Sequence, residues 1–356
     1  MSASLPETPQ LRADYVLEGQ FFAWPLAVPG ECEPIEPDSA FISTGAPAAD
    51  GRMVWGGTEG AEAHVFAALF KGAAGGVIDL GAVPEALAIT AVEPLPAGHP
   101  LAVGAASALV LAWLAPGWEV WRYQAPAPHD SIQEPGFGRP EPTLLAKGED
   151  ETVTGLAMLG QRPVVVAECY IYAVNPDGSL ERLEDLPGQP VCPPVRLGDA
   201  YWWLDEFGAL VGLLPDGTLC PTPVTVPLDS ERAALCAWGN TLLAAADGVL
   251  FNLDPVRNRG EMVGRTPLPE VQCLAGLPDG RAYGVCGCGI GHVFRVDREP
   301  ARCVALGAAA TAVGTHRYGF AFSRAAATAE GVIFLGEHDR SGHLWAYYPP
   351  LVAARA

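Results

Sequence analysis

Charge is scarce in this sequence, and positive charge most of all. Asp, Glu, Lys and Arg make up 17% of the 356 residues, and 41 acidic against 21 basic side chains give a formal net charge of −20. Proteins bind duplex DNA and RNA through basic stripes that release counterions, and no such stripe is visible here. Anionic membrane surfaces likewise attract clusters of lysine and arginine. The sequence therefore argues against nucleic acid and membrane partners.

Long apolar runs and a secretory leader are also missing. No run approaches the roughly 18 apolar residues of a membrane-spanning helix. The first twenty residues, MSASLPETPQLRADYVLEGQ, have neither a basic n-region nor an apolar h-region. The odd number and irregular spacing of the nine cysteines do not suggest a disulfide framework. We therefore expect a reducing, cytoplasmic location with mostly buried free thiols.

Glycine and proline, by contrast, are abundant. The 41 glycines and 34 prolines make up about a fifth of the chain, while apolar residues reach 49%, too many for a disordered chain. Many short strands joined by tight turns fit this composition. Amphipathic runs with a 3.6-residue period, which helical repeats require, are almost absent. The composition predicts an all-β fold.

Three stretches of the sequence resemble one another closely. They are DGRMVWGGTEGAEAHVF (50–66), DGRAYGVCGCGIGHVFRVD (279–297) and EGVIFLGEHDRSGHLWAYYPP (330–350). Each begins with an acidic residue and glycine, runs through a short apolar strand, turns, and enters a second strand at His-Val-Phe or His-Leu-Trp. Weaker copies lie between them. The equivalent positions are Phe66, Trp121, Tyr172, Gly212, Phe251, Phe294 and Trp345.

These positions repeat about every 46 residues, the length of a four-stranded propeller blade. The sequence thus predicts a single domain, residues 1–356, folded as one closed β-propeller of seven four-stranded blades. The chain ends too soon after Trp345 for a full outer strand. Segment 15–26 (YVLEGQFFAWPL) is expected to complete the last blade and close the ring, because an open ring would expose sheet edges. The Pro-rich stretch 124–142 is the longest expected loop, and we expect a monomer or a weak oligomer.

Ring closure also predicts where a site lies. With the strands of a blade named A to D from the channel outward, the loop before each repeated histidine joins B to C. The three strong repeats are the first, sixth and seventh, which are consecutive in a closed ring. Their B–C loops, 58–63, 286–291 and 337–342, are therefore expected together on one face.

A metal site is one hypothesis for this face. Cys286, Cys288 and His292 lie in CGCGIGH, and in an extended Cys-x-Cys both sulfurs point the same way. Two thiolates, one imidazole and a fourth ligand such as His343 or His338 would suit a structural zinc ion. The alternative is that the two cysteines are small buried hydrophobes in a glycine-rich turn.

Candidate catalytic residues lie in two short polar runs. His316, Arg317 and Tyr318 (THRYGF) are expected at the start of the seventh inner strand, and His338 and Arg340 lie in EHDR. Histidine, tyrosine and arginine together can supply a base, an acid and a carboxylate clamp. The alternatives are a solvated turn with local ion pairs for EHDR and an ordinary loop entry for THRY.

The repeated His64, His292 and His343 share one place in the three repeats. A structural role is expected, in which each imidazole hydrogen-bonds the backbone of a neighbouring blade. A ligand or catalytic role is the alternative.

The pattern DG-x-x-Y-x-G…GH-[VL]-[FW]-x-x-D of 279–297, together with GEHDRSGHLWAYYPP (336–350), resembles repeats of a seven-bladed propeller family that includes some polysaccharide (ulvan-type) lyases. The resemblance implies proton removal alpha to a uronate carboxylate, beside a structural zinc. It casts His316 or His338 as base, Tyr318 as acid and Arg317 or Arg340 as clamp. The missing signal peptide departs from lyases of extracellular polymers and favours a small or imported substrate.

The leading hypothesis from the sequence is an intracellular propeller enzyme. Its acid–base chemistry, an elimination, isomerisation or cyclisation, would act on a small polar or saccharide-like molecule at the B–C face. The rival is a non-catalytic propeller that binds a protein or ligand through the same face. A deep polar pocket favours the enzyme, and an exposed contiguous apolar patch favours the rival.

Overall fold

The computed structural model describes residues 8–11, 18–25, 41–47, 53–60, 62–71, 74–103, 106–125, 141–149, 152–229, 232–311, 317–338 and 342–350. Within these ranges the chain forms 28 strands and no helix. No helical segment in the described ranges could therefore cross a membrane.

The strands form antiparallel meanders, most of them of four consecutive strands. The largest sheet holds eight strands: β2 (Phe41–Pro47), β3 (Met53–Glu59), β4 (His64–Lys71), β5 (Ala74–Ala82), β6 (Ala88–Leu95), β7 (Ala106–Trp113), β8 (Trp118–Ala125) and β9 (Thr143–Gly148). The next sheet along the chain holds β10 (Val153–Leu159), β11 (Arg162–Ala167), β12 (Tyr170–Val174) and β13 (Leu180–Asp185). It is followed by β14 (Val195–Leu197), β15 (Ala200–Leu204), β16 (Ala209–Leu213) and β17 (Leu219–Thr225).

Three more four-stranded sheets complete the described chain. The first holds β18 (Ala234–Trp238), β19 (Thr241–Ala246), β20 (Val249–Asp254) and β21 (Arg259–Arg265). The second holds β22 (Val271–Gly276), β23 (Ala282–Cys286), β24 (His292–Arg298) and β25 (Ala301–Ala308). The third combines both ends of the chain: β26 (Phe322–Ala327), β27 (Ile333–Glu337), β28 (His343–Tyr348) and β1 (Gln20–Pro25).

The eight-stranded sheet consists of two four-stranded meanders, β2–β5 and β6–β9. One residue pair, Glu59 with Ala88, joins β3 to β6. The two meanders approach closely at Gly57, where an added Cβ would lie 2.1 Å from the Cβ of Ile89. Any larger residue at Gly57 would push β3 and β6 apart.

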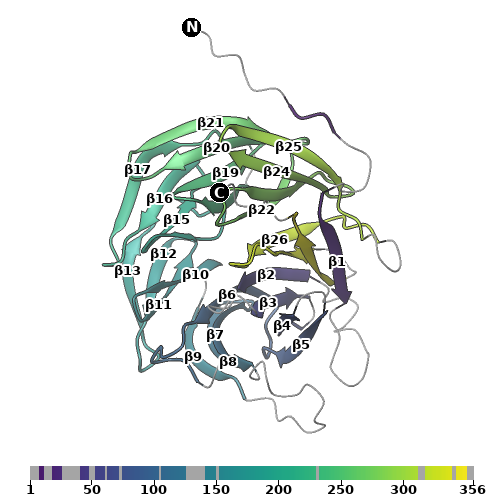
Figure 1. Cartoon of the computed structure of the whole chain (residues 1–356). Coiled ribbons are helices and arrows are strands. Elements are labelled where there is room, and N and C mark those ends of the chain that lie inside the picture. The colour runs from purple at the N-terminus through teal and green to yellow at the C-terminus, as the bar shows by residue number, and fades with distance from the viewer. Residues whose placement is uncertain are drawn as a thin grey trace.

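The sheets are arranged around a common centre, with the first strand of each nearest to it (Figure 1). Along this inner circle β6 contacts β2 and β10, β22 contacts β18 and β26, and β26 contacts β2. The protein is thus an all-β, propeller-like arrangement of small four-stranded sheets.

The N-terminal strand lies beside the last repeat. β1 pairs antiparallel with β28, in a register that runs from Gln20 with Tyr348 to Pro25 with His343. Phe21 holds it there, because its buried ring lies 4.7 Å from the ring of Tyr347. Of the segment 15–26, positions 18–25 are described. Most of the Pro-rich stretch, 126–140, lies outside the described residues.

The repeat positions follow the strand order. The seven positions chosen from the sequence all fall on third strands of meanders, namely β4, β8, β12, β16, β20, β24 and β28. The sequence pattern therefore marks the same strand each time.

The core lies between neighbouring sheets. Trp203, which is fully buried, packs in a cluster drawn from three sheets, β10–β13, β14–β17 and β18–β21. Phe66 of the first repeat packs with Phe334 and Leu344 of the last. Burying aromatic side chains in this way stabilises a fold by about 25 cal/mol per Å² of apolar surface. The eight cysteines in the described ranges are all free thiols.

Candidate functional site

β-Bulges distort the first strand of several meanders near its start. A bulge inserts an extra residue, bends the strand and re-aims a side chain, and bulges are common beside active sites. The register shifts at Ile89/Ala91 in β6, at Val153/Gly155 in β10, at Val271/Cys273 in β22 and at Phe322/Ala325 in β26. In β26 two residues, Ser323 and Arg324, thus lie opposite the single residue Gly336.

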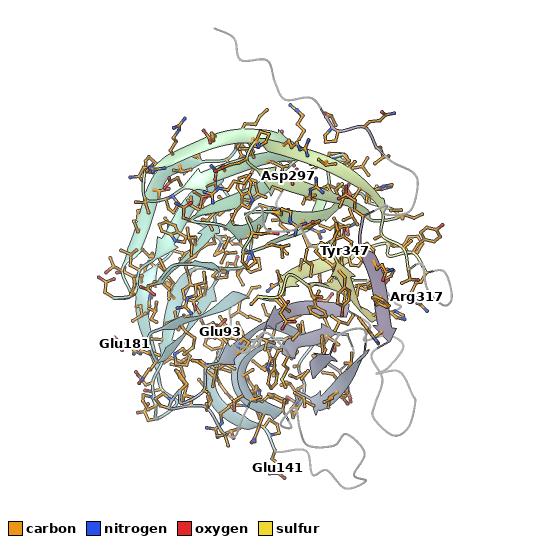
Figure 2. The ribbon with its side chains drawn as sticks, viewed as in Figure 1. Glu93, Glu141, Glu181, Asp297, Arg317 and Tyr347 are labelled. Atoms are coloured by element: carbon orange, nitrogen blue, oxygen red, sulfur yellow. The ribbon has the colours of Figure 1, made fainter. Side chains whose placement is uncertain are left out.

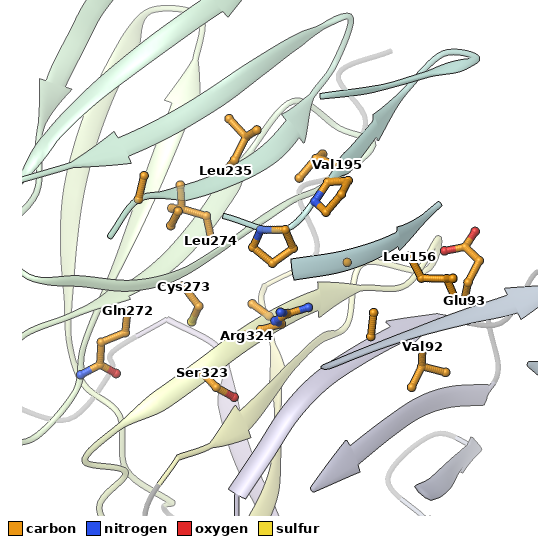
Figure 3. A pocket seen from close by; sticks show the side chains of 17 residues that line it. Val92, Glu93, Leu156, Val195, Leu235, Gln272, Cys273, Leu274, Ser323 and Arg324 are labelled. Carbon is orange, nitrogen blue, oxygen red and sulfur yellow. The ribbon is translucent and has the colours of Figure 1, made fainter. Parts of the chain in front are cut away.

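These strands surround a cavity of about 240 Å³ at the centre of the sheets. β6, β10, β18, β22, β26 and the start of β14 all contribute to its wall (Figure 3). Most of the lining side chains are apolar, and polar atoms make up about half of the cavity surface. Its charged residues are Glu93 and Arg324, and its other polar side chains are Gln272 and Ser323. Figure 2 shows Glu93 among the inner strands, whereas Glu181 lies at the periphery.

Arg324 carries the positive charge of this cavity. Its guanidinium makes no hydrogen bond or ion pair with any described residue. Burial lowers the pKa of Arg324 to about 10, and the nearby Cys192 sulfur and Glu59 carboxylate partly oppose that effect. The side chain therefore remains a cation at neutral pH. A cation held away from water without a partner is costly, so this position favours an anion from solution.

Glu93 carries the negative charge and also makes no hydrogen bond or ion pair with the described residues. Burial raises the pKa of Glu93 to about 7, and the Arg196 guanidinium partly opposes the shift. Tyr201 lies close by, since the Glu93 charge adds to the burial that raises the pKa of this tyrosine to about 12. Glu93 thus changes its charge in the physiological pH range.

Gln272 fixes the bulge in β26. Its Oε1 accepts a hydrogen bond from the Phe322 amide at 2.8 Å, and its Nε2 donates to the Phe320 carbonyl at 3.1 Å. Ser323 donates its hydroxyl to the Gly336 carbonyl at 3.4 Å. These two side chains are already bonded to the protein, so they position Arg324 rather than offer free groups to a ligand.

A histidine–carboxylate pair lies near the same arginine. His338 Nε2 is 2.5 Å from Glu59 Oε1, and both side chains are partly exposed. The His338 amide donates to the Ala321 carbonyl at 2.8 Å, which holds the histidine beside the segment that leads into β26. A carboxylate that accepts from one ring nitrogen fixes the tautomer and leaves the basic lone pair on the other nitrogen. Glu59 and His338 together could therefore act as an acid–base pair.

The other predicted catalytic residues that the structure describes do not line the cavity. Arg317 Nη1 lies 3.4 Å from Nδ1 of His343, so Arg317 faces a buried histidine. Tyr318 is 37% exposed and bridges to Ala310. His316 and Arg340 lie outside the described residues.

The four predicted zinc ligands do not gather in the described structure. Cys286 is fully buried, its Sγ donates to the His292 carbonyl at 3.4 Å, and burial raises the pKa of its thiol to about 12. Gly287 follows with a φ of 109°, which ends β23 and turns Cys288 to the surface. The Cys-x-Cys is thus not extended, and its two sulfurs do not share one side. His343 Nδ1 lies 2.9 Å from Glu337 Oε2.

In the part of the chain that the structure describes, no three histidine, cysteine, aspartate or glutamate side chains form a group that could hold a metal ion. The zinc site stays a prediction.

Two of the three repeated histidines, His64 and His343, take partners within their own sheets. His64 Nδ1 lies 3.1 Å from Asp79 on the adjacent strand β5, and Glu337 accepts from both Nδ1 and the amide of His343. The expected partner was the backbone of a neighbouring blade. In these two repeats the histidine instead joins strands of its own sheet. The Nδ1 of His292 is buried and has no hydrogen-bond partner among the described residues. Glu337, the first residue of the EHDR run, is fully buried, whereas the solvated-turn alternative for this run would leave it exposed.

Exposed apolar side chains occur on two adjoining loops. Ile290 is 36% exposed, Tyr318 37% and Phe320 49%. A hydrogen bond of 2.8 Å from the Gly291 amide to the Gly319 carbonyl places these loops side by side.

Arg324, Glu93 and Glu59 were not selected from the sequence. Arg324 stands out when the first strands of the meanders are aligned by the residues with which they pair on the second strands. Arg324 then takes the place of Cys273 in β22 and Ala91 in β6, so a long cation stands where the other repeats have a small apolar residue.

The chain resembles known proteins in fold only. No protein-family model and no curated protein sequence matches it. The extracellular domain of a putative hybrid two-component system from B. thetaiotaomicron aligns with a TM-score of 0.56 at 14% identity, over 94% of this chain and 40% of that one. U3-55K aligns with a TM-score of 0.59 at 11% identity, over 93% and 98% of the two chains. A chain of the Mitotic Checkpoint Complex aligns with a TM-score of 0.61 at 11% identity, over 99% and 100%. These likenesses support a β-propeller fold, and this chain spans well under half of the first structure.

Proposed function

We propose that this protein binds a small organic anion in the cavity at the centre of its sheets. The observation that carries the proposal is Arg324, a cation that a bulge presents to the cavity and that makes no ion pair with a described residue. Ligand pockets are commonly apolar with a few placed polar groups, and arginine suits carboxylates because it binds both oxygens. A carboxylate is therefore the favoured anion.

The proposal includes a closed ring of seven four-stranded blades, in which this cavity is the central channel. Support comes from the meanders β2–β5, β6–β9 and β26–β28 with β1, and from the contact between the inner strands β2 and β26. The hydrogen bond between Glu59 and His338 joins the same two repeats.

The proposed activity is acid–base chemistry on the bound carboxylate. Glu59 and His338 would serve as the proton-transfer pair, while Arg324 holds the substrate and stabilises negative charge that develops next to its carboxylate. The Coulombic effect of Glu59 on Arg324 supports this assignment, because the Glu59 carboxylate is close enough to influence the arginine that would hold the substrate. Tyr318 and Arg317 remain candidates for the acid and a second clamp.

Binding is tested with matched probes. Pentanoate should raise the melting temperature of the wild-type protein, and the neutral pentanamide should not, because a ligand stabilises the state it binds. Arg324→Gln should abolish the pentanoate effect. Arg257→Gln, at a side chain that is 77% exposed on an outer turn, should retain it and serves as the control. An equal shift in wild-type and Arg324→Gln protein would contradict the proposal.

Proton transfer is tested by isotope exchange. Small 3-keto carboxylates, of a size that the cavity can hold, are incubated with the protein in D₂O, and loss of the α-proton signal is followed by NMR. His338→Gln should abolish the exchange and leave pentanoate binding unchanged. No exchange with any of these compounds would limit the protein to binding.

Binding of a protein partner is the second candidate function. The exposed Ile290, Tyr318 and Phe320 on adjoining loops favour it, since clustered apolar side chains mark interaction surfaces. Replacing all three with serine would abolish such binding without affecting pentanoate.

A further inference from the structure

The cavity at the centre of the sheets holds two opposite charges that do not neutralise each other. Arg324 of β26 and Glu93 of β6 both line it, and neither makes an ion pair within the described residues. In the view of Figure 3, Arg324 lies between Gln272 and Glu93. Two opposite charges in one small cavity would normally form an ion pair. Because Arg324 and Glu93 do not, each is available to a different end of one ligand.

Apolar side chains share this cavity with the two charges. Val92, Leu156 and Leu274 are among the side chains that line it, and the prolines before β14 add rigid apolar surface. These apolar side chains can contact the methylene groups of a ligand. At about 30 Å³ per water, the cavity of about 240 Å³ holds on the order of eight non-hydrogen atoms. The ligand is thus small, with polar groups at its ends.

We infer that the natural ligand is a small zwitterion whose carboxylate meets Arg324 and whose ammonium group meets Glu93, with a short apolar chain between them. This inference rests on the proposed function, because it places the carboxylate at the same arginine, and it adds the class of the ligand. Amino acids with their amine and carboxylate a few methylenes apart are the chemical class that fits.

Glu93 makes this recognition dependent on pH. An ammonium group attracts the ionised carboxylate and gains much less from the protonated form. Burial raises the pKa of Glu93 to about 7, so its charge appears between pH 6 and 8. The charged and titratable groups that face it are Arg196 of β14, Tyr201 of β15 and Arg324 across the cavity. Arginine and tyrosine do not change charge in this range, so the pH dependence belongs to Glu93.

The test compares 5-aminopentanoate with pentanoate by calorimetry at pH 8 and pH 6. Wild-type protein should bind the amino compound about tenfold more tightly at pH 8, and most of this preference should disappear at pH 6. Glu93→Gln should bind both compounds alike at either pH and keep its affinity for pentanoate. Arg324→Gln should lose both. A shorter pair, 3-aminopropanoate with propanoate, tests the spacing between the two charges.

The outcomes separate the inference from the proposed function. If wild-type protein binds pentanoate through Arg324 but shows no preference for either amino compound at pH 8, the zwitterion is excluded and the anion site stands. If neither pentanoate nor an amino compound binds, the anion site itself is wrong. A preference that persists in Glu93→Gln would also overturn the inference, because the ammonium group would then bind elsewhere.

Discussion

Glu59 and His338 lie 2.5 Å apart, although 279 residues separate them in the chain. The contact joins the end of β3, in the first repeat, to the residue that follows β27, in the last. Few other polar contacts connect such distant parts of the described chain, and this one lies near the arginine of the central cavity. It therefore links the arrangement of the sheets to the proposed chemistry.

The first prediction concerns this pair. A double-mutant cycle with Glu59→Gln and His338→Gln should give a coupling energy of about 0.5–1 kcal/mol in urea unfolding, since the side chains are only partly exposed. The matched cycle at Arg259 and Glu261, which are more exposed and share one strand, should give less. Equal coupling in the two cycles would show that the contact contributes nothing specific to joining the ends.

The second prediction concerns the N-terminal strand. Phe21→Ala should cost about 3 kcal/mol of unfolding free energy, because the buried ring packs against Trp345 and Tyr347. Phe22→Ala, at the adjacent and partly exposed position of β1, should cost about 1 kcal/mol or less. Urea midpoints at an unchanged m-value measure both. Similar small losses would mean that β1 contributes little to the last sheet.

The sequence predicted the repeats better than the site. A period of about 46 residues marks one strand per meander, because turn glycines and paired aromatic residues recur wherever the same hairpin is built. The N-terminal strand could be predicted as well, since YVLEGQFFAWPL is strand-like and the last repeat lacks an outer strand.

The bulge could not be predicted from the sequence. In FSRAAATA the arginine reads as an ordinary strand residue, and only the extra residue opposite Gly336 directs it into the cavity. The backbone at the Cys-x-Cys could not be predicted either, because the positive φ of Gly287 leaves Cys286 buried and Cys288 exposed. Local backbone irregularities at single residues decide both cases.

The third prediction is a pH dependence of stability. Glu93 keeps its proton in the folded protein up to about pH 7, whereas the unfolded chain releases it near its ordinary pKa of 4.5. Between these values the folded state binds more protons, so stability should fall as the pH rises and level off above about pH 7. The loss should be about 2 kcal/mol, less than the full shift because the side chain keeps some access to water.

Glu93→Gln should remove this fall, and Glu184→Gln, at an exposed position of β13, should keep it. Urea unfolding between pH 4.5 and 8 gives the three curves. A Glu93→Gln curve parallel to that of the wild type would show that Glu93 titrates normally.

The fourth prediction tests the cysteine pair. Iodoacetamide should label the exposed Cys288 quickly and the buried Cys286 only after unfolding, since burial raises the thiol pKa of Cys286 to about 12. Peptide mass spectrometry measures each rate. Because the two sulfurs do not share one side, zinc should leave the rate at Cys288 unchanged. Protection of Cys288 by zinc would instead establish the metal site predicted from CGCGIGH.

The last prediction returns to Arg324. Holding an unpaired guanidinium away from water opposes folding, and the lowered pKa of about 10 reflects the same cost. Arg324→Met should therefore leave the unliganded protein as stable as the wild type or stabilise it by about 1–2 kcal/mol, because an apolar side chain of similar length can fill the space. The same variant should lose all stabilisation by pentanoate.

If a substitution makes the protein more stable but abolishes ligand binding, the original residue serves function at a cost in stability. Arg324→Met and Arg257→Met should be compared by urea unfolding with and without pentanoate. A loss above about 1 kcal/mol in the unliganded Arg324 variant alone would mean that the protein itself already neutralises this cation, and the cavity would then have no charge to offer an anion.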